Sequence, residues 1–282
     1  MRSFFLYAAA VGLLTGCAAA PPSAPPAPAG VMLSYAAPAP TTATYAFVDS
    51  SGFNIRGGAI GDITVAARAS GTAEAAIAPK GTDVEMRVKV TDLTGSFSNS
   101  AMGGTTNATE ADVQGEAVMT VSPRGALTIA QLPTTSRSAQ GIGMGAGFFR
   151  RFTVPLAAVP VRRGSTWTDT VRASDDNAGV KSAVTDIVTT TWARDTVVAG
   201  RTLNVLTHST QRTLEVAGTS EGVQIAQKLS GTATGYTLWD PQRNLVVERF
   251  ENTDLSGTFD LPAMGLSGMP VTARGFGRIT LR

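Results

Sequence analysis

One heptapeptide carries the clearest structural signal in the chain: Val84-Glu85-Met86-Arg87-Val88-Lys89-Val90. Apolar and charged side chains alternate in it with a period of two, so the apolar side chains share one face and the charged ones share the other. A segment with one apolar and one charged face is typical of an antiparallel strand that covers a core. We predict a strand here, with its charged face toward solvent.

The same period of two continues on both sides of this heptapeptide. Val and Thr are plentiful, and no long segment has the 3.6-residue period of a helix. We therefore predict a mainly β protein with little helix. The predicted strands are 62–69, 72–78, 84–90, 113–121, 126–132, 166–173, 180–196, 201–216, 224–238, 245–255 and 271–281.

A recurring motif indicates how neighbouring strands are joined. Ser70-Gly71-Thr72-Ala73 returns as Ser230-Gly231-Thr232-Ala233, and the matching segments 91–97 and 253–259 follow them. Pro and Gly between the members of each pair favour a turn, so each unit is predicted to be a β-hairpin. Several hairpins in series make a large antiparallel sheet. A sheet of this kind curls into a half-barrel or open barrel, or folds into a sandwich.

The N-terminus has the parts of a secretory signal peptide. Arg2 supplies a basic start, and residues 4–14 form an apolar run that is short for a membrane span. The run ends in Leu14-Thr15-Gly16-Cys17, which resembles the lipobox of bacterial lipoproteins: an aliphatic residue, a small residue, Gly or Ala, then Cys. The resemblance implies that residues 1–16 are removed, that the Cys17 sulfur receives a diacylglyceryl group, and that acyl chains such as palmitate modify the new amine.

This resemblance also implies a location. Ala18 stands where an aspartate would retain a lipoprotein of this kind in the inner membrane. We therefore expect an outer-membrane lipoprotein on the periplasmic face, held by a multi-acyl anchor that gains about 0.8 kcal/mol per buried methylene. The alternative is a soluble secreted protein cut at an Ala-x-Ala site, in which Cys17 has no role. Cys17 is the only cysteine, so no disulfide can form within one chain.

Residues 17–43 are predicted to hold the lipidated cysteine and a tether. Seven prolines, spaced by small residues, favour an extended and semi-rigid segment that builds no core. One apolar patch, Val31–Tyr35, interrupts the tether and is expected to dock either on the folded domain or on the membrane. We predict that the antiparallel β domain spans residues 44–282.

Composition argues against several kinds of partner. The formal charge of +2 falls to +1 when residues 1–16 are removed, because Arg2 is the only charged residue among them. Such a weak charge gives no reason to expect nucleic acid as a partner. The only histidine, His208, has no second histidine or free thiol to join it, so we predict no metal site and no cofactor.

One segment resembles a catalytic motif. Gly218-Thr219-Ser220-Glu221-Gly222 fits the G-x-S-x-G pattern of serine hydrolases, in which a strained turn from strand to helix exposes the serine. No helix pattern follows it here, and His208 precedes the serine instead of following it. A hairpin turn between Val216 and Val223 explains the same residues. We predict that the protein has no catalytic residues and is not an enzyme.

The candidate ligand segment is Phe148-Phe149-Arg150-Arg151-Phe152, which follows the glycine-rich run Gly141–Gly147. Aromatic side chains beside arginines suit contact with lipid headgroups or the mouth of a hydrophobic site. We therefore predict that Phe148, Phe149 and Phe152 contact a ligand. The alternative is an edge strand that places Phe148 or Phe149 in the core.

Residues 160–167, Pro-Val-Arg-Arg-Gly-Ser-Thr-Trp, resemble a sequence motif of an uncharacterised group of secreted, β-rich bacterial lipoproteins. Together with the hairpin motif, the likeness extends over most of residues 44–282. Some members of that class resemble the open barrels of lipoprotein carriers, which hold acyl chains on a concave sheet face. The resemblance implies a binding or carrier module for a lipid or other hydrophobic ligand. The alternative is a structural or protein-interaction component of the envelope without a ligand.

Overall fold

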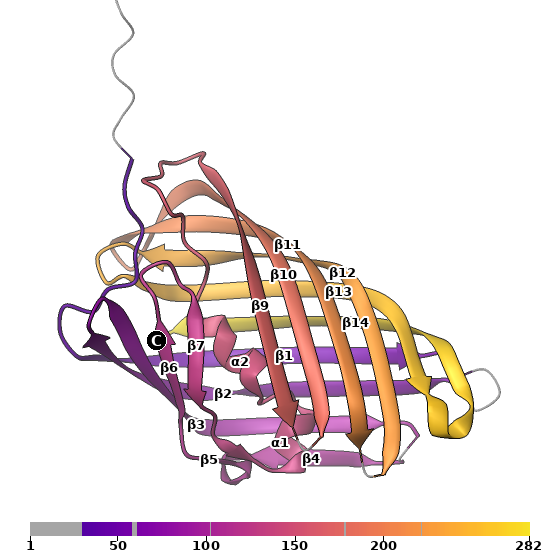
Figure 1. The fold of residues 1–282 in the computed structure, drawn as a ribbon. Helices are drawn as coiled ribbons and strands as arrows, with labels where there is room; N and C mark the ends of the chain where they lie inside the picture. The colour runs from indigo at the N-terminus through magenta and orange to yellow at the C-terminus, as the bar shows by residue number, and fades with distance from the viewer. Residues whose placement is uncertain (1–29, 58–60, 102, 178, 221) are drawn as a thin grey trace, which may run out of the picture.

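A computed structural model describes residues 30–282 except 58–60, 102, 178 and 221, so the predicted signal peptide and Cys17 lie outside the described residues. The fold is 70% strand and 7% helix, and a large antiparallel sheet curls into an open half-barrel (Figure 1). The prediction of a mainly β protein built from hairpins is confirmed. Of the architectures predicted, the half-barrel is the one adopted.

Twelve strands form the main sheet, and the first and last of them pair at its middle. One side holds β1 (Thr41–Ile55), β2 (Ile63–Lys80), β3 (Asp83–Asn99), β4 (Thr105–Thr109), β6 (Ala117–Val121) and β7 (Leu127–Gln131). The other side holds β14 (Leu266–Leu281), β13 (Leu245–Leu261), β12 (Val223–Asp240), β11 (Arg201–Ser220), β10 (Val180–Val198) and β9 (Thr166–Asn177). The strand order is β7-β6-β3-β2-β1-β14-β13-β12-β11-β10-β9, with β4 on β3. A separate small sheet pairs β5 (Val113–Gln114) with β8 (Thr134–Thr135).

The heptapeptide 84–90 lies in β3 and has the predicted two faces. Its four apolar side chains are at most 3% exposed, while Arg87 and Lys89 face solvent. On the solvent face Arg87 pairs with Glu85 at 2.8 Å and with Glu116 at 2.9 Å. Burial of the apolar face and hydration of the charged one fix the orientation of the strand in the sheet.

The repeated motif occupies equivalent places in two hairpins, β2–β3 and β12–β13. Gly71 pairs with Leu93, and Gly231 pairs with Leu255. A Cβ atom at Gly71 would lie 1.9 Å from the Asp92 carbonyl oxygen, and one at Gly231 would lie 2.2 Å from the Asp254 carbonyl oxygen. The two glycines therefore permit a close approach of backbones that any larger residue would prevent.

The chain must cross the open side of the half-barrel because β7 and β9 lie at opposite edges of the sheet. The crossing segment contains α1 (Arg137–Gly141), α2 (Ala146–Phe149) and the 3₁₀ turn η3 (Arg150–Phe152), which sit inside the curve of the sheet (Figure 1). We call residues 136–156 the plug. Two further 3₁₀ turns are η2 (Glu110–Asp112) and η4 (Pro262–Met264). Among the described residues, no helix has the length and apolar character that crossing a membrane requires.

Two hydrophobic clusters divide the concave face. We call the end that holds the start of β1 the near end, and the opposite end the far end. The larger cluster lies at the near end between the plug and the sheet, and includes Tyr45, Phe47 and Trp239. The smaller cluster lies at the far end, and consists of Ile55, Leu229, Leu255, Met269, Val271 and Ala273.

The apolar patch of the predicted tether is part of the folded domain. Leu33 and Tyr35 are each only 3% exposed, and the Tyr35 ring packs edge-on against Trp239 at 4.7 Å between centroids. The Tyr35 hydroxyl accepts a hydrogen bond from the Val154 N–H at 2.7 Å, so this segment holds the end of the plug. The folded region therefore begins before residue 44, and β1 itself starts at Thr41.

Candidate functional site

A cavity of about 590 Å³ lies on the concave face, between the plug and strands β1, β9, β10, β11, β13 and β14. Its apolar lining includes Phe53, Leu127, Ile142, Phe148, Leu214 and Leu255. Its charged lining includes Asp49, Arg150, Arg151, Asp186, Arg212, Arg249 and Glu251. The cavity thus combines an apolar wall with a group of ionised side chains.

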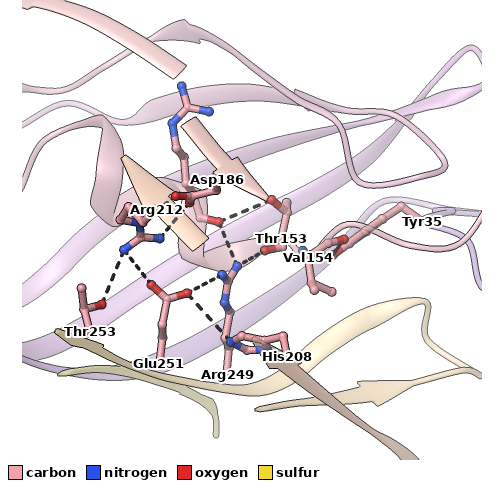
Figure 2. Close-up of polar contacts among 10 residues, drawn as sticks. Tyr35, Thr153, Val154, Asp186, His208, Arg212, Arg249, Glu251 and Thr253 are labelled. Atoms are coloured by element: carbon pink, nitrogen blue, oxygen red, sulfur yellow. Dashed lines mark hydrogen bonds and ion pairs between the residues drawn. The ribbon is translucent and has the colours of Figure 1, made fainter. Parts of the chain in front are cut away.

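Arg212 is the centre of a buried ion-pair network (Figure 2). It lies opposite Asp186 across β10 and β11, and its Nε and Nη2 each donate to one carboxylate oxygen of Asp186 at 2.8 Å. Its Nη1 lies 3.0 Å from Oε1 of Glu251. One guanidinium therefore joins β11 to both β10 and β13 through bidentate and single charge-assisted contacts.

Glu251 lies between two arginines. Its Oε2 also pairs with Arg249 Nη2 at 3.0 Å, from the same face of β13. Burial alone would raise the pKa of Glu251, but the guanidinium groups of Arg249 and Arg212 outweigh burial and lower the pKa to about 2. The carboxylate is therefore ionised at neutral pH, and the network holds a fixed charge inside the half-barrel.

Two arginine contacts hold the plug against the sheet. Arg249 Nη1 donates to the carbonyl oxygens of Thr153 and Arg150, both in the plug (Figure 2). Arg151, in η3, forms an ion pair with Asp49 of β1. Burial raises the pKa of the Asp49 carboxyl, and Arg151 opposes that effect. The ionised network therefore also fixes the floor of the cavity in place.

Arg150 differs from the other inward arginines. It lines the cavity, but within the described part of the chain no carboxylate lies at ion-pair distance from its guanidinium. Partial burial lowers its pKa, and Asp175 and Asp186 act on it only electrostatically. An anion entering the cavity would give this cation its first direct partner.

His208 lies on β11 beside this network (Figure 2). Its side chain is 1% exposed, its Nε2 is 3.9 Å from Glu251 Oε2, and neither ring nitrogen has a hydrogen-bond partner in the described structure. Burial, with Arg249 beside it, lowers the pKa of His208 to about 4. The imidazole is therefore neutral at pH 7.

The three predicted ligand residues lie in the plug. Phe148, Phe149 and Phe152 are each at most 1% exposed, with Phe148 edge-on to Phe47 at 4.9 Å between centroids. Of the three, Phe148 lines the cavity, whereas Phe149 and Phe152 pack within the near-end core. The alternative is confirmed in placing Phe148 and Phe149 in the core. It is wrong about the edge strand, because these residues form α2 and η3 on the concave face.

Two other motifs have definite places. The segment that resembles a hydrolase motif falls where β11 ends and β12 begins: Ser220 pairs with Val223, and Glu221 lies outside the described residues. The element that follows is a strand, β12. The segment 160–167 leads from the plug into β9, and the Nε1–H of its Trp167 donates to the Pro155 carbonyl at 3.2 Å. Neither segment brings a nucleophile and a base together among the residues described.

The residues predicted from the sequence for the site do not include Asp186, Arg212, Arg249 or Glu251. A signal for them was present, because alternate residues of a strand share a face. Arg212 is two residues from Leu214 and Glu251 is four residues from Leu255, so each charged residue lies on the same strand face as that leucine. Charged residues on an otherwise apolar face were therefore visible before the fold was known.

No protein-family model matches the chain, and the search of curated proteins finds no match. A function for this protein therefore has to be argued from the cavity, the network and the sequence motifs.

Proposed function

We propose that the protein is a periplasmic lipoprotein of the outer membrane and a binding or carrier module for a hydrophobic ligand with an anionic head. The observation that carries this proposal is the cavity of about 590 Å³, where an apolar wall meets the unpaired guanidinium of Arg150. Cavities of roughly 300–1,000 Å³ with a few convergent polar groups are typical of small-molecule sites. The proposal includes no catalytic step, cofactor or nucleic acid.

The apolar wall supports the hydrophobic part of the ligand. Phe53 and Leu214 are only partly buried, although both belong to the concave face. Ala67, Ala173 and Ala273 also line the cavity, and such small side chains leave space that larger ones would fill. Covering this wall with an acyl chain gains about 25 cal/mol for each Å² of apolar surface removed from water.

The charged floor supports the anionic head. A desolvated guanidinium without a counter-ion is costly, and a carboxylate or phosphate beside Arg150 would offset that cost with charge-assisted hydrogen bonds. Arg151, Arg212 and Arg249 already have carboxylate partners. Arg172 also lines the cavity without an ion pair in the described structure, but it is exposed, whereas Arg150 is partly buried. We therefore assign Arg150 to the ligand head, with Phe148 beside the start of the acyl chain.

The proposed location rests on the sequence. Leu14-Thr15-Gly16-Cys17 resembles a lipobox, and Ala18 carries no inner-membrane retention signal. If Cys17 is the lipidated residue, replacing it with Ser releases the protein from the membrane fraction or leaves its precursor unprocessed. Metabolic labelling with an alkyne-tagged palmitate then marks the natural chain and not Cys17→Ser. Labelling of both would contradict the assignment of Cys17.

The binding proposal is tested by native mass spectrometry of the protein purified from its own membranes. We expect the spectrum to show the mass of the protein plus one lipid or fatty acid. After that lipid is removed, adding palmitate should raise the melting temperature of the stripped protein. Arg150→Gln should reduce the shift in melting temperature, while Arg56→Gln, at an exposed arginine, should leave it unchanged. Absence of any bound molecule, together with no shift from fatty acids or phospholipids, would contradict the proposal.

The second candidate is a structural or protein-interaction component of the envelope that has no ligand. It is favoured by the plug, because Phe149 and Phe152 fill the near half of the concave face with protein side chains. The negative outcome of the experiment above would support this candidate. A partner protein recovered by crosslinking in intact cells would then be required.

A further inference from the structure

Exposed apolar side chains gather at one corner of the near end. They are Val31, Met32, Val159, Val197 and Val198, which are 44–67% exposed. The described residues contain ten exposed large hydrophobic side chains, so half of them lie at this corner. Isolated exposed apolar residues are ordinary, but a cluster of them marks an interaction surface.

Backbone contacts tie Val31 and the loop that carries Val159 to β10, whose end carries Val197 and Val198. Val31 and Val161 exchange two hydrogen bonds, at 2.7 and 2.9 Å, which place Val31 beside the loop that carries Val159. Gly164 N donates to the Trp192 carbonyl at 2.7 Å, which ties the same loop to β10. The turn from β10 to β11 then carries 197–198 at its tip. Figure 1 shows the first described residues, this loop and this turn together at the upper left. We call this surface the near-end corner.

The near-end corner also carries positive charge. Arg162, Arg163 and Arg194 are exposed, and no ion pair engages them within the described residues. Arg201, at 54% exposure, reaches Asp240 at 3.6 Å. Asp195, near the end of β10, accepts hydrogen bonds from the side chains of Trp192 and Asn204. Basic side chains around exposed aliphatic ones are typical of surfaces that bind anionic lipid.

The path of the chain points to the same partner. Gly30 lies against Pro160 in the near-end corner, where a Cβ atom on Gly30 would be 2.9 Å from the Pro160 carbonyl carbon. Gly30 lies thirteen residues after Cys17, and a chain of that length spans at most about 47 Å. A lipid on Cys17 would therefore keep this corner within reach of the bilayer.

We propose that the near-end corner docks on the surface of a bilayer that contains anionic phospholipid. The aliphatic side chains enter the interfacial region, and Arg162, Arg163 and Arg194 contact lipid phosphates. This inference rests on the lipid anchor proposed above, and it adds an orientation: the near end faces the membrane and the far end points away. The lipid anchor keeps the domain close to the membrane, and the near-end corner sets the orientation of the domain relative to the membrane.

The test uses single introduced cysteines in the mature lipidated protein, since lipidation occupies the only natural thiol. Val159→Cys and Val197→Cys probe the corner, and Met264→Cys is the control, because Met264 is 60% exposed at the far end. Each variant is labelled with an environment-sensitive fluorophore and reconstituted into vesicles of phosphatidylcholine and phosphatidylglycerol. We expect a blue shift and quenching by lipid-borne quenchers at positions 159 and 197, and neither effect at 264.

The outcomes separate the two proposals. Protein that floats with the vesicles but gives the same signal at all three positions would overturn the docking surface and leave the anchor intact. Protein that does not float with the vesicles, with Cys17 open to thiol reagents, would overturn the anchor. Corner signals that are as strong on phosphatidylcholine alone would overturn the role assigned to the arginines, because phosphatidylcholine carries no net charge.

Discussion

The near and far halves of the concave face are built from the same strands but are packed differently. On β1, Tyr45 and Phe47 at the near end are each 1% exposed, whereas Phe53 toward the far end is only half-buried. The same change runs along β11, from fully buried Leu206 to half-buried Leu214. The plug covers the first half and leaves the second open. The crossing segment, more than the sheet, therefore decides which part of the interior is filled by protein side chains.

The largest effect is expected when one aromatic residue is truncated in each half. Phe149→Ala removes a fully buried ring from the near-end core, so we expect a loss of about 3–5 kcal/mol in the free energy of unfolding. Phe53→Ala removes a ring that already contacts the cavity, and we expect a clearly smaller loss. Urea unfolding followed by tryptophan fluorescence measures both. Equal losses would contradict the assignment of a packed and an open half.

A pH experiment tests the buried network between the two halves. Folding lowers the pKa of His208 from 6.5 to about 4, so the unfolded chain binds more protons between these values. Stability from the neutral imidazole is therefore present above pH 6.5 and is lost as the pH falls toward 4, by up to about 3 kcal/mol. His208 is the only histidine, and the pKa of Glu251 lies lower still, at about 2.

The measurement is the free energy of unfolding in urea at pH 7, 6, 5 and 4. His208→Gln should flatten the decline between pH 6.5 and 5, where the acidic side chains are still mostly ionised. An unchanged decline in this variant would show that His208 is not the group responsible. Exposed Arg56→Gln serves as the matched control, and should follow the natural protein throughout.

A smaller effect is expected at the boundary between the cavity and the plug. Arg150→Gln should weaken palmitate binding about tenfold, which corresponds to about 1.4 kcal/mol, because the amide keeps hydrogen bonding but removes the charge. Its free energy of unfolding without ligand should stay within about 0.5 kcal/mol of the natural protein, since the described structure gives this guanidinium no ion pair. A large loss in the free energy of unfolding with unchanged palmitate binding would show that the Arg150 side chain holds the plug against the sheet and does not bind the ligand.

Much of the fold is predictable because its signals are local. Alternation at 84–90 predicts a strand, and the repeated Gly71 and Gly231 predict hairpins, since each depends only on neighbours in the chain or in one hairpin. The state of Phe148–Phe152 is not predictable in this way. These residues lie inside the curve because the chain must cross from β7 to β9 at the opposite edge, which is a property of the complete sheet.

The candidate site is only partly predictable. The sequence predicts Phe148 as a ligand residue, and the structure shows only that Phe148 lines the cavity. The partners of Arg212 lie on two other strands and depend on strand register. Parity along each strand indicates which charges face inward, and it does not indicate which carboxylate meets which arginine. Lipidation of Cys17 concerns residues outside the described structure, and it stays a prediction from the sequence.

Titration calorimetry measures palmitate binding to protein from which bound lipid has been removed. The account predicts saturable binding at one site, about tenfold weaker in Arg150→Gln and abolished in Leu214→Trp, where a larger side chain fills the cavity beside the far-end cluster. Val223→Trp, at an exposed position in the same half, should bind as the natural protein does. Palmitate binding that is unaffected by Leu214→Trp in a folded protein, or no binding at all, would contradict the account.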